Sequence, residues 1–143
     1  MGSQLVIGFV AGFVSVWIFS SGGIAVLAAA GSAVPFPAWS MAPTQPFGVP
    51  QTLSGAFWGG LWGVLYALLE PWLTSQLGWW VGGLAFGVLP LLALWFVALP
   101  LKGLPVGGGF ATLPQDLLLH AVFGLGAAIV FRLVIGALRG QVS

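Results

Sequence analysis

The chain alternates between four long apolar stretches and short segments rich in proline, glycine or polar residues. The apolar stretches cover about residues 5–31, 52–70, 79–100 and 113–138. A helix needs about 20 mostly apolar residues to cross a bilayer, and each stretch is close to or above that length. We therefore predict an all-α, polytopic membrane protein. It is a bundle of four transmembrane helices within a single domain of residues 1–143.

The segment between the first two stretches is the most irregular part of the sequence. Residues 32–51 contain five prolines, which exclude a regular helix there. The segment is not a polar linker, because it also contains Phe36, Trp39, Met41 and Phe47. Irregular backbone at membrane depth must be covered by protein. We predict an ordered, proline-rich loop that packs on the end of the bundle or partly re-enters it.

Helix breakers predict where the apolar stretches bend or end. A Ser-Ser-Gly-Gly run at 20–23 predicts a kink after Phe19 in the first stretch. The Glu70-Pro71 pair predicts the end of the second stretch. Pro90 predicts a kink near the middle of the third, because proline cannot donate the helical hydrogen bond and its ring clashes with the preceding turn.

Charge is nearly absent. Lys, Arg, Asp and Glu make up 3% of the residues, against roughly 25% in soluble domains. The helix assignments place the five charged residues on two faces of the membrane: Lys102 and Asp116 on one, and Glu70, Arg132 and Arg139 on the other. The bias of arginine and lysine toward the cytoplasm predicts a bacterial inner (plasma) membrane protein with both termini cytoplasmic.

Small residues recur at every fourth position on each predicted helix. Such ridges let two helices approach backbone to backbone. We favour packing within one bundle, and the alternative is contact with another chain. The ridge residues are Gly8 and Gly12, then Gly55, Gly59, Gly63 and Ala67, then Gly83 and Gly87, and finally Gly124 and Ala128.

A second row on the second helix is formed by Trp58, Trp62, Tyr66 and Glu70. We expect this row to face lipid, and the alternatives are a cavity wall or a contact with a hydrophobic partner. Glu70 and Arg132 lie near the same interface, because the second and fourth helices run in the same direction. We expect an ion pair there. The alternatives are independent snorkelling of each side chain or a proton or ion relay.

His120 is the single histidine, and Asp116 precedes it by four residues, on the same helix face. Three interpretations remain open: a structural hydrogen bond, proton coupling, and ligation of haem or a chlorophyll-type pigment among the small residues of that face. A relay would draw on both pairs of residues. We expect no resident cofactor, with the pigment or haem as the alternative.

Several classes of chemistry have no support in the sequence. Cysteine is absent, and we find no phosphate-binding loop, no metal-ligand cluster and no nucleophile motif. The net charge of +1 does not favour a nucleic-acid partner. We therefore do not expect an enzyme.

The run from Ser40 to Gln51, followed by Ala56-Phe-Trp-Gly-Gly-Leu-Trp-Gly63, resembles a motif of small, uncharacterised bacterial integral membrane proteins. Leu101-Lys-Gly103 and Pro105 fit the same resemblance, which spans most of the chain. Such a family brings no activity, cofactor or residue roles.

Our first hypothesis is a non-catalytic integral membrane subunit or assembly partner of a larger membrane protein complex. Its partners would be the lipid bilayer and other membrane subunits or further copies of itself. The second is a small oligomeric channel or transporter for an ion or small solute. The third is pigment or haem binding through His120.

Overall fold

The structure is a computed structural model that describes residues 1–34, 36–103 and 110–142. These residues are 81% helical. Within them, four helical stretches are long and apolar enough to cross a membrane: Gly2–Ala29, Gln51–Leu77, Trp79–Leu101 and Leu113–Gln141. The predicted helical class and the four apolar helices are confirmed, and they indicate a membrane-embedded protein.

The first and third stretches are built from several short helical elements. The first consists of α1 (Gly2–Ser15), the π-helical segment η1 (Val16–Ser20) and α2 (Ser21–Ala29). The third consists of α4 (Trp79–Phe86), α5 (Val88–Ala93), the π-helical segment η2 (Leu94–Ala98) and α6 (Leu99–Leu101).

The second and fourth stretches are continuous helices. A two-stranded antiparallel hairpin of β1 (Pro43–Thr44) and β2 (Val49–Pro50) leads into α3 (Gln51–Leu77). The 3₁₀ turn η4 (Phe110–Thr112) leads into α7 (Leu113–Val142).

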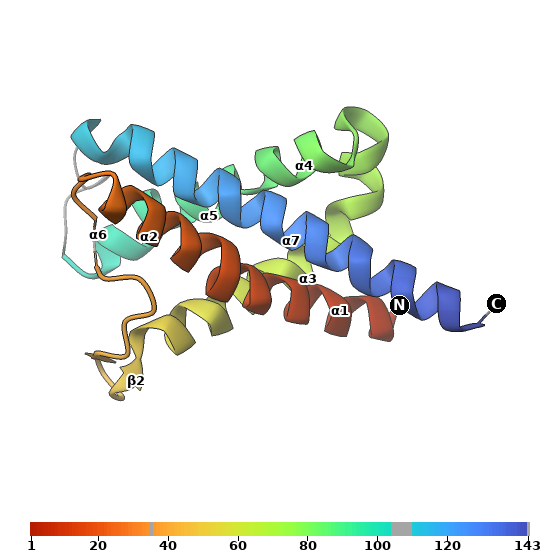
Figure 1. The fold of residues 1–143 in the computed structure, drawn as a ribbon, viewed down its shortest axis with the longest axis horizontal. Helices are drawn as coiled ribbons and strands as arrows, with labels where there is room; N and C mark the ends of the chain where they lie inside the picture. The colour runs from red at the N-terminus through yellow and green to blue at the C-terminus, as the bar shows by residue number, and fades with distance from the viewer. Residues whose placement is uncertain (35, 104–109, 143) are drawn as a thin grey trace.

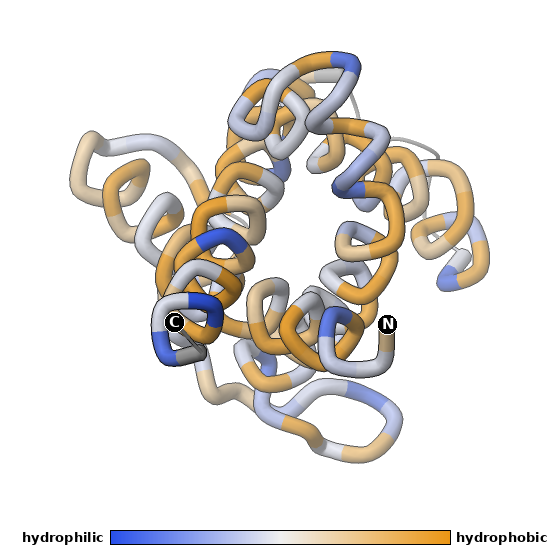
Figure 2. The backbone as a smooth tube through the Cα atoms, turned by 90° about the vertical axis from the view of Figure 1, so that its right-hand side faces the viewer, coloured by the Kyte–Doolittle hydropathy of each residue, from blue (hydrophilic) through white to orange (hydrophobic). Residues whose placement is uncertain are grey.

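The four stretches run up and down. Both chain termini and the turn from α3 to α4 lie at one end, and the hairpin, α6 and the end of α2 lie at the other (Figure 1). Neighbouring helices form a closed order in which α3 contacts α1, α1 contacts α7, α7 contacts α4 and α4 contacts α3. Apolar residues dominate the backbone all the way around the molecule (Figure 2).

Aromatic side chains join three of the helices in the core. The Tyr66 ring of α3 packs edge-on against Phe86 of α4 at 5.2 Å and against Phe131 of α7 at 5.6 Å between ring centroids. All three side chains are buried. Each edge-to-face pair contributes roughly 0.5–1.5 kcal/mol beyond its burial, so this cluster helps to fix how α3, α4 and α7 meet.

Pro71 does not end the second helix as the sequence predicted. α3 continues to Leu77, through Pro71. A proline inside a helix removes one backbone hydrogen bond, and its ring clashes with the carbonyl four residues earlier. The helix therefore kinks at this point if it does not break. The Thr74 hydroxyl donates to the Glu70 carboxylate at 2.9 Å, and this bond links the two sides of the proline.

The third stretch breaks at Gly87 rather than at Pro90. α4 ends at Phe86, and Pro90 lies in the first turn of α5. The residue four before Pro90 is Phe86, whose carbonyl the proline ring would meet in a continuous helix. The break therefore falls where the clash would occur, three or four residues before the proline itself.

The predicted kink in the first stretch coincides with η1. The Ser21 amide donates to the carbonyls of Val16 and Ile18. In a regular α-helix it would donate to Trp17. The Trp17 carbonyl instead accepts the indole N–H of Trp39 at 2.7 Å. Single π turns inside α-helices often occur where another group inserts into the hydrogen-bond pattern.

The hydrogen bond from Trp39 to the Trp17 carbonyl fastens the loop to the middle of the first helical stretch. Further bonds hold the loop to the start of α3: the backbone carbonyl of Ser40 accepts from both the amide at 3.0 Å and the hydroxyl at 2.7 Å of Thr52. Phe47 lies in the hairpin turn and is 89% exposed. The loop therefore folds back along the bundle and presents an aromatic tip.

Candidate functional site

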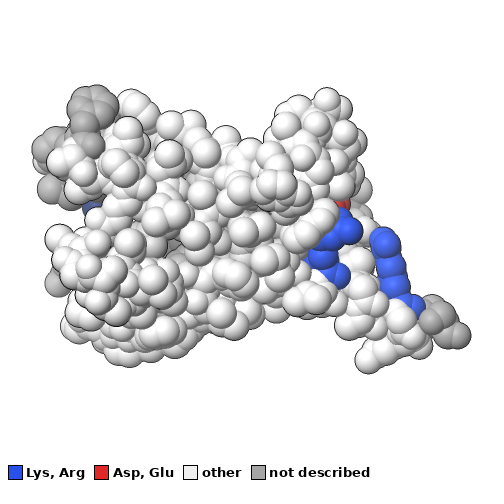
Figure 3. Space-filling model, turned by 45° about the horizontal axis from the view of Figure 1, so that its top comes forward, with Lys and Arg blue, Asp and Glu red and all other residues white. Residues whose placement is uncertain are grey.

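Charged side chains are confined to the two ends of the molecule. In Figure 3 the lysine and arginine side chains gather mainly at one end, and the middle of the visible face carries no charge. Two polar clusters result. One contains Glu70 and Arg132, and the other contains Asp116 and His120.

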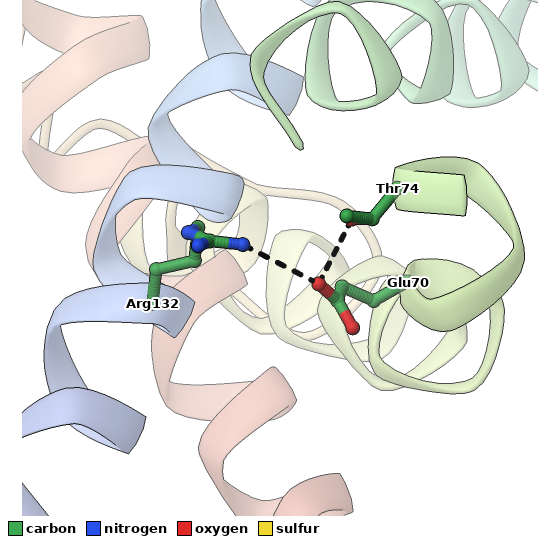
Figure 4. A network of polar contacts seen from close by, with 3 residues as sticks. All are labelled: Glu70, Thr74 and Arg132. Carbon is green, nitrogen blue, oxygen red and sulfur yellow. Dashed lines mark hydrogen bonds and ion pairs between the residues drawn. The ribbon is translucent and has the colours of Figure 1, made fainter. Parts of the chain in front are cut away.

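The first cluster lies where α7 passes the bend in α3 (Figure 4). Arg132 Nη1 is 3.9 Å from Glu70 Oε1, and the same oxygen accepts the Thr74 hydroxyl at 2.9 Å. The Arg132 side chain is 48% exposed and that of Glu70 is 19% exposed. The guanidinium is therefore paired with the carboxylate electrostatically without a hydrogen bond, a type of contact worth roughly 0–1 kcal/mol.

An aromatic ring supports the arginine from the other side. The Arg132 guanidinium carbon lies 5.4 Å from the centre of the Trp79 ring, at the start of α4. A cation over an aromatic face at this distance gains roughly 0.5–1 kcal/mol at an exposed site. Arg132 thus touches α3 through Glu70 and α4 through Trp79.

The second cluster joins the start of α7 to η2. Asp116 Oδ2 accepts the Trp95 indole N–H at 3.3 Å and the Thr112 hydroxyl at 3.1 Å. Asp116 lies in the first turn of α7, where a negative charge is favoured by the helix dipole. This carboxylate therefore ties two helical stretches together.

His120 bonds to the backbone of Asp116 and not to its carboxylate. The His120 Nδ1 atom lies 2.8 Å from the Asp116 carbonyl oxygen. A carbonyl oxygen only accepts hydrogen bonds, so Nδ1 carries a proton, and in the neutral ring Nε2 carries the lone pair. The bond between these two residues is therefore a local one, made to the backbone one helical turn earlier.

The small residues beside His120 do not leave room for a flat pigment ring. A Cβ at Gly124 would meet the Gly83 carbonyl, and a Cβ at Gly83 would lie 2.7 Å from the Ala128 methyl. The backbone of α4 therefore fills the face on which the sequence allowed a tetrapyrrole. His120 Nε2 remains the one imidazole atom that could ligate a group, but the small residues beside it are occupied by contacts with α4.

The two clusters are separate. Asp116 and Arg132 are 16 residues apart on α7, about 24 Å along the helix. Residues 121–131 between His120 and Arg132 include no ionisable side chain. The structure thus brings Glu70 to Arg132 and Asp116 to His120, but it does not join the two pairs into one path along α7.

The glycine ridges lie at two helix crossings. Between α1 and α3, a Cβ at Gly12 would meet the Gly59 carbonyl, and a Cβ at Gly63 would meet the Gly8 carbonyl. Gly55 belongs to the same ridge in sequence but is exposed, and its Cβ would only touch the Val16 side chain at 3.6 Å. The crossing therefore uses Gly59 and Gly63, and Gly55 lies at its margin.

The second crossing joins α4 to α7. A Cβ at Gly87 would meet the His120 carbonyl, and Gly83 and Gly124 approach each other in the same way. Both crossings depend on backbone contact, since any side chain larger than hydrogen would require the helices to move apart.

The tryptophan row of α3 changes its surroundings along its length. Trp58 is 59% exposed. Trp62 packs edge-on against Phe86 at 6.4 Å between ring centroids, and Tyr66 is buried beside it. Trp62 and Tyr66 belong to the core contacts. For Trp58, which is exposed, contact with lipid stays a prediction.

Three contacts made by tryptophans were not predicted from the sequence: Trp95 with Asp116, Trp79 with Arg132, and Trp39 with Trp17. For Trp95 a signal existed. Trp95 and Asp116 are equally far in sequence from the middle of the glycine-rich segment between the third and fourth predicted helices. Because two consecutive membrane-spanning helices run antiparallel, such residues lie at similar depths, so the pairing could have been predicted.

Within the described residues, no group of three or more His, Cys, Asp or Glu side chains could hold a metal ion.

Comparisons of the chain with protein-family profiles, with curated proteins and with solved structures give no match.

Proposed function

We propose that this protein is a non-catalytic integral membrane subunit or assembly partner of a larger membrane protein complex. The observation that carries this proposal is the contrast between the interior of the chain and its outer surface. The buried polar groups are used inside the chain, and the outward faces of the helices are apolar and rich in exposed aromatic side chains.

The buried polar side chains support a structural use. In the described part of the chain these are Ser15, Ser21 and Thr52. Ser15 donates to the Phe123 carbonyl at 2.7 Å, which links α1 to α7. No buried side-chain nitrogen or oxygen in the described residues lacks a hydrogen-bond partner. The fully enclosed side-chain nitrogens and oxygens of the described residues are therefore already hydrogen-bonded, which favours a structural use for them.

The outer face of α3 is the best candidate for contact with a partner. Phe57, Trp58 and Leu61 are 50%, 59% and 42% exposed. No described residue accepts the Trp58 indole N–H. An indole donor within the depth of a bilayer gains from an acceptor on another chain. Since Gly59 and Gly63 face α1, a partner would meet this aromatic face rather than the glycine ridge.

The test is the mass of the complex that is purified from native membrane in mild detergent. The wild-type chain should be recovered in a stoichiometric assembly larger than its own monomer. Replacing Phe57 and Trp58 with alanine should release the chain from that assembly. Leu133→Ala, at a 67% exposed position on α7, is the matched control and should not release it. A wild-type chain recovered as a monomer would contradict the proposal.

The membrane setting is part of the proposal: a bacterial inner membrane with both termini in the cytoplasm. It is supported by the two arginines at the end that carries both termini, against one lysine at the other end. Because the chain has no cysteine, single cysteines at Ser3 and Met41 give a direct test. In intact spheroplasts, an impermeant maleimide should label the cysteine at 41 and not the one at 3. The reverse pattern would invert the orientation.

A small channel or transporter is the second candidate. The polar groups at both ends favour it, because Asp116 and His120 are partly buried at one end and Glu70 at the other. The uncharged stretch of α7 between them means that a polar path would have to form between chains. Proteoliposomes that hold the oligomer should then conduct ions, and Glu70→Gln and His120→Ala should reduce the flux. Absence of flux from such vesicles removes this candidate.

A further inference from the structure

The end of the molecule that carries both termini holds more positive charge than its own contacts use. The Arg132 guanidinium makes no hydrogen bond to any described residue, although it lies near Glu70 and over Trp79. The Arg139 side chain has no hydrogen bond or ion pair with any residue that the structure describes. Each guanidinium carries five N–H donors. Among the described side chains at this end, two arginines and a single carboxylate leave a net positive charge and N–H donors that the contacts above do not use.

The two arginines share one face of α7. They are seven residues apart, which is two helical turns or about 10 Å along the axis. Side chains as long as arginine can converge on one group between them. Figure 3 shows basic side chains gathered together at this end.

The surface between them is open. Gly136 lies one turn from Arg132 and about one turn from Arg139 on the same face, and a Cβ at this position would have no atom within 4 Å. The two arginines therefore flank an uncovered stretch of helix surface at Gly136. An anion could occupy this open space and accept hydrogen bonds from both arginines.

The surroundings indicate an amphiphilic anion rather than a soluble one. Leu133 and Leu138 on the same helix segment are 67% and 47% exposed. Trp72 and Trp80, at the nearby turn from α3 to α4, are 60% and 54% exposed. Exposed tryptophans typically lie at the level of lipid headgroups, and exposed leucines beside them would meet acyl chains.

We propose that Arg132 and Arg139, with Gly136 between them, form a binding site for the phosphate headgroup of an anionic phospholipid. The arginines donate to the phosphate oxygens, and Trp79 holds the Arg132 guanidinium at the edge of the site. The proposal rests on the membrane location of the chain but not on its role as a subunit. The purified chain alone can test it.

The test is native mass spectrometry of the full chain in neutral detergent, with added phosphatidylglycerol or phosphatidylcholine. The wild type should bind phosphatidylglycerol in preference to phosphatidylcholine. Arg132→Gln and Arg139→Gln should each weaken that binding about fivefold, and the double variant about 25-fold. Lys102→Gln, a neutralised cation at the opposite end, is the matched control and should bind as the wild type does.

Two further variants separate the site from general charge. Gly136→Leu fills the open space without changing charge and should weaken binding. Gly22→Leu, at another helix position with nothing within 4 Å, should not. Circular dichroism establishes that each variant keeps its helices. Wild-type binding by the double arginine variant, or equal binding of the two lipids, would overturn the proposal. Displacement by millimolar inorganic phosphate would overturn the lipid assignment in favour of a free phosphate site.

Discussion

The two glycine crossings look alike in sequence but differ in what surrounds them. At the α1–α3 crossing, glycines on both helices meet backbone to backbone, and this is the most extensive contact between any two helices described. At the α4–α7 crossing, Gly87 meets the carbonyl of His120, and α4 ends one residue before Gly87. The glycines of the first crossing lie within the regular turns of α1 and α3. The second crossing lies at a helix break and beside a polar cluster.

The two crossings show how much a small-residue ridge in a sequence can indicate. Four-residue spacing shows that a helix can be approached closely. It does not distinguish a rigid contact from one that adjoins a break and a titratable side chain. Substitutions at the two crossings should therefore differ in how much they destabilise the fold.

The largest effect is expected at the α1–α3 crossing. Gly63→Ala places a methyl group against the Gly8 carbonyl, so two long helices must separate. We expect a loss of about 3 kcal/mol in the free energy of unfolding, the upper part of the range for overpacking. Unfolding by sodium dodecyl sulfate, followed by circular dichroism, measures it.

Gly55→Ala is the matched control for Gly63→Ala. Gly55 has the same helix, residue type and spacing, but its Cβ would lie in ordinary contact with one side chain. Because alanine favours helix over glycine, this variant should be neutral or more stable by up to about 1 kcal/mol. Equal destabilisation by both substitutions would show that the ridge does not act through the crossing.

A smaller effect is expected at the α4–α7 crossing. Gly87→Ala places a methyl group against the His120 carbonyl, but the break beside Gly87 allows α4 to shift. We expect a loss of about 1–2 kcal/mol. The shift should also move the His120 ring Nδ1–H signal in a nitrogen–proton NMR spectrum, which Gly63→Ala should leave in place. An unchanged His120 signal would contradict the link between this crossing and the polar cluster.

The Asp116 cluster should contribute less again. Asp116→Leu leaves the Trp95 indole and the Thr112 hydroxyl without this acceptor, and we expect a loss of about 1 kcal/mol. Asp116→Asn keeps an acceptor oxygen and should lose less than half as much. A loss that is the same for both variants would assign the effect to charge in the first turn of α7 rather than to the hydrogen bonds.

The sequence predicts much of this fold because its main signals are local. An apolar run of about 20 residues identifies a helix that can span a bilayer without knowledge of its neighbours. Ridge spacing identifies Gly59, Gly63, Gly83 and Gly124 as positions of close approach. Gly55 has the same spacing but is exposed. The spacing identifies positions that allow close approach, but it does not show which of them the neighbouring helix covers.

The rest depends on contacts between distant segments. Pro71 and Pro90 both lie inside apolar stretches. α3 continues through Pro71, whereas the third stretch breaks at Gly87, three residues before Pro90. The two sites also differ in their contacts with α7: Glu70, beside Pro71, pairs with Arg132, whereas Gly87 lies against the His120 carbonyl. Likewise, nothing local to Trp17 predicts that its carbonyl accepts the Trp39 indole from the loop.

The smallest effect is expected for the Glu70–Arg132 pair, and its size decides how this end of the molecule is understood. At 3.9 Å and with Arg132 48% exposed, the pair should contribute less than about 1 kcal/mol to the free energy of unfolding. A double-mutant cycle of Glu70→Gln and Arg132→Gln, in low and high salt, measures the coupling. A weak coupling that falls with salt leaves the arginine available to an outside anion, whereas a coupling of 2 kcal/mol or more would mean that Glu70 already uses it. The cycle therefore contrasts this open end with the Asp116 end, where the carboxylate is held by two hydrogen-bond donors within the chain.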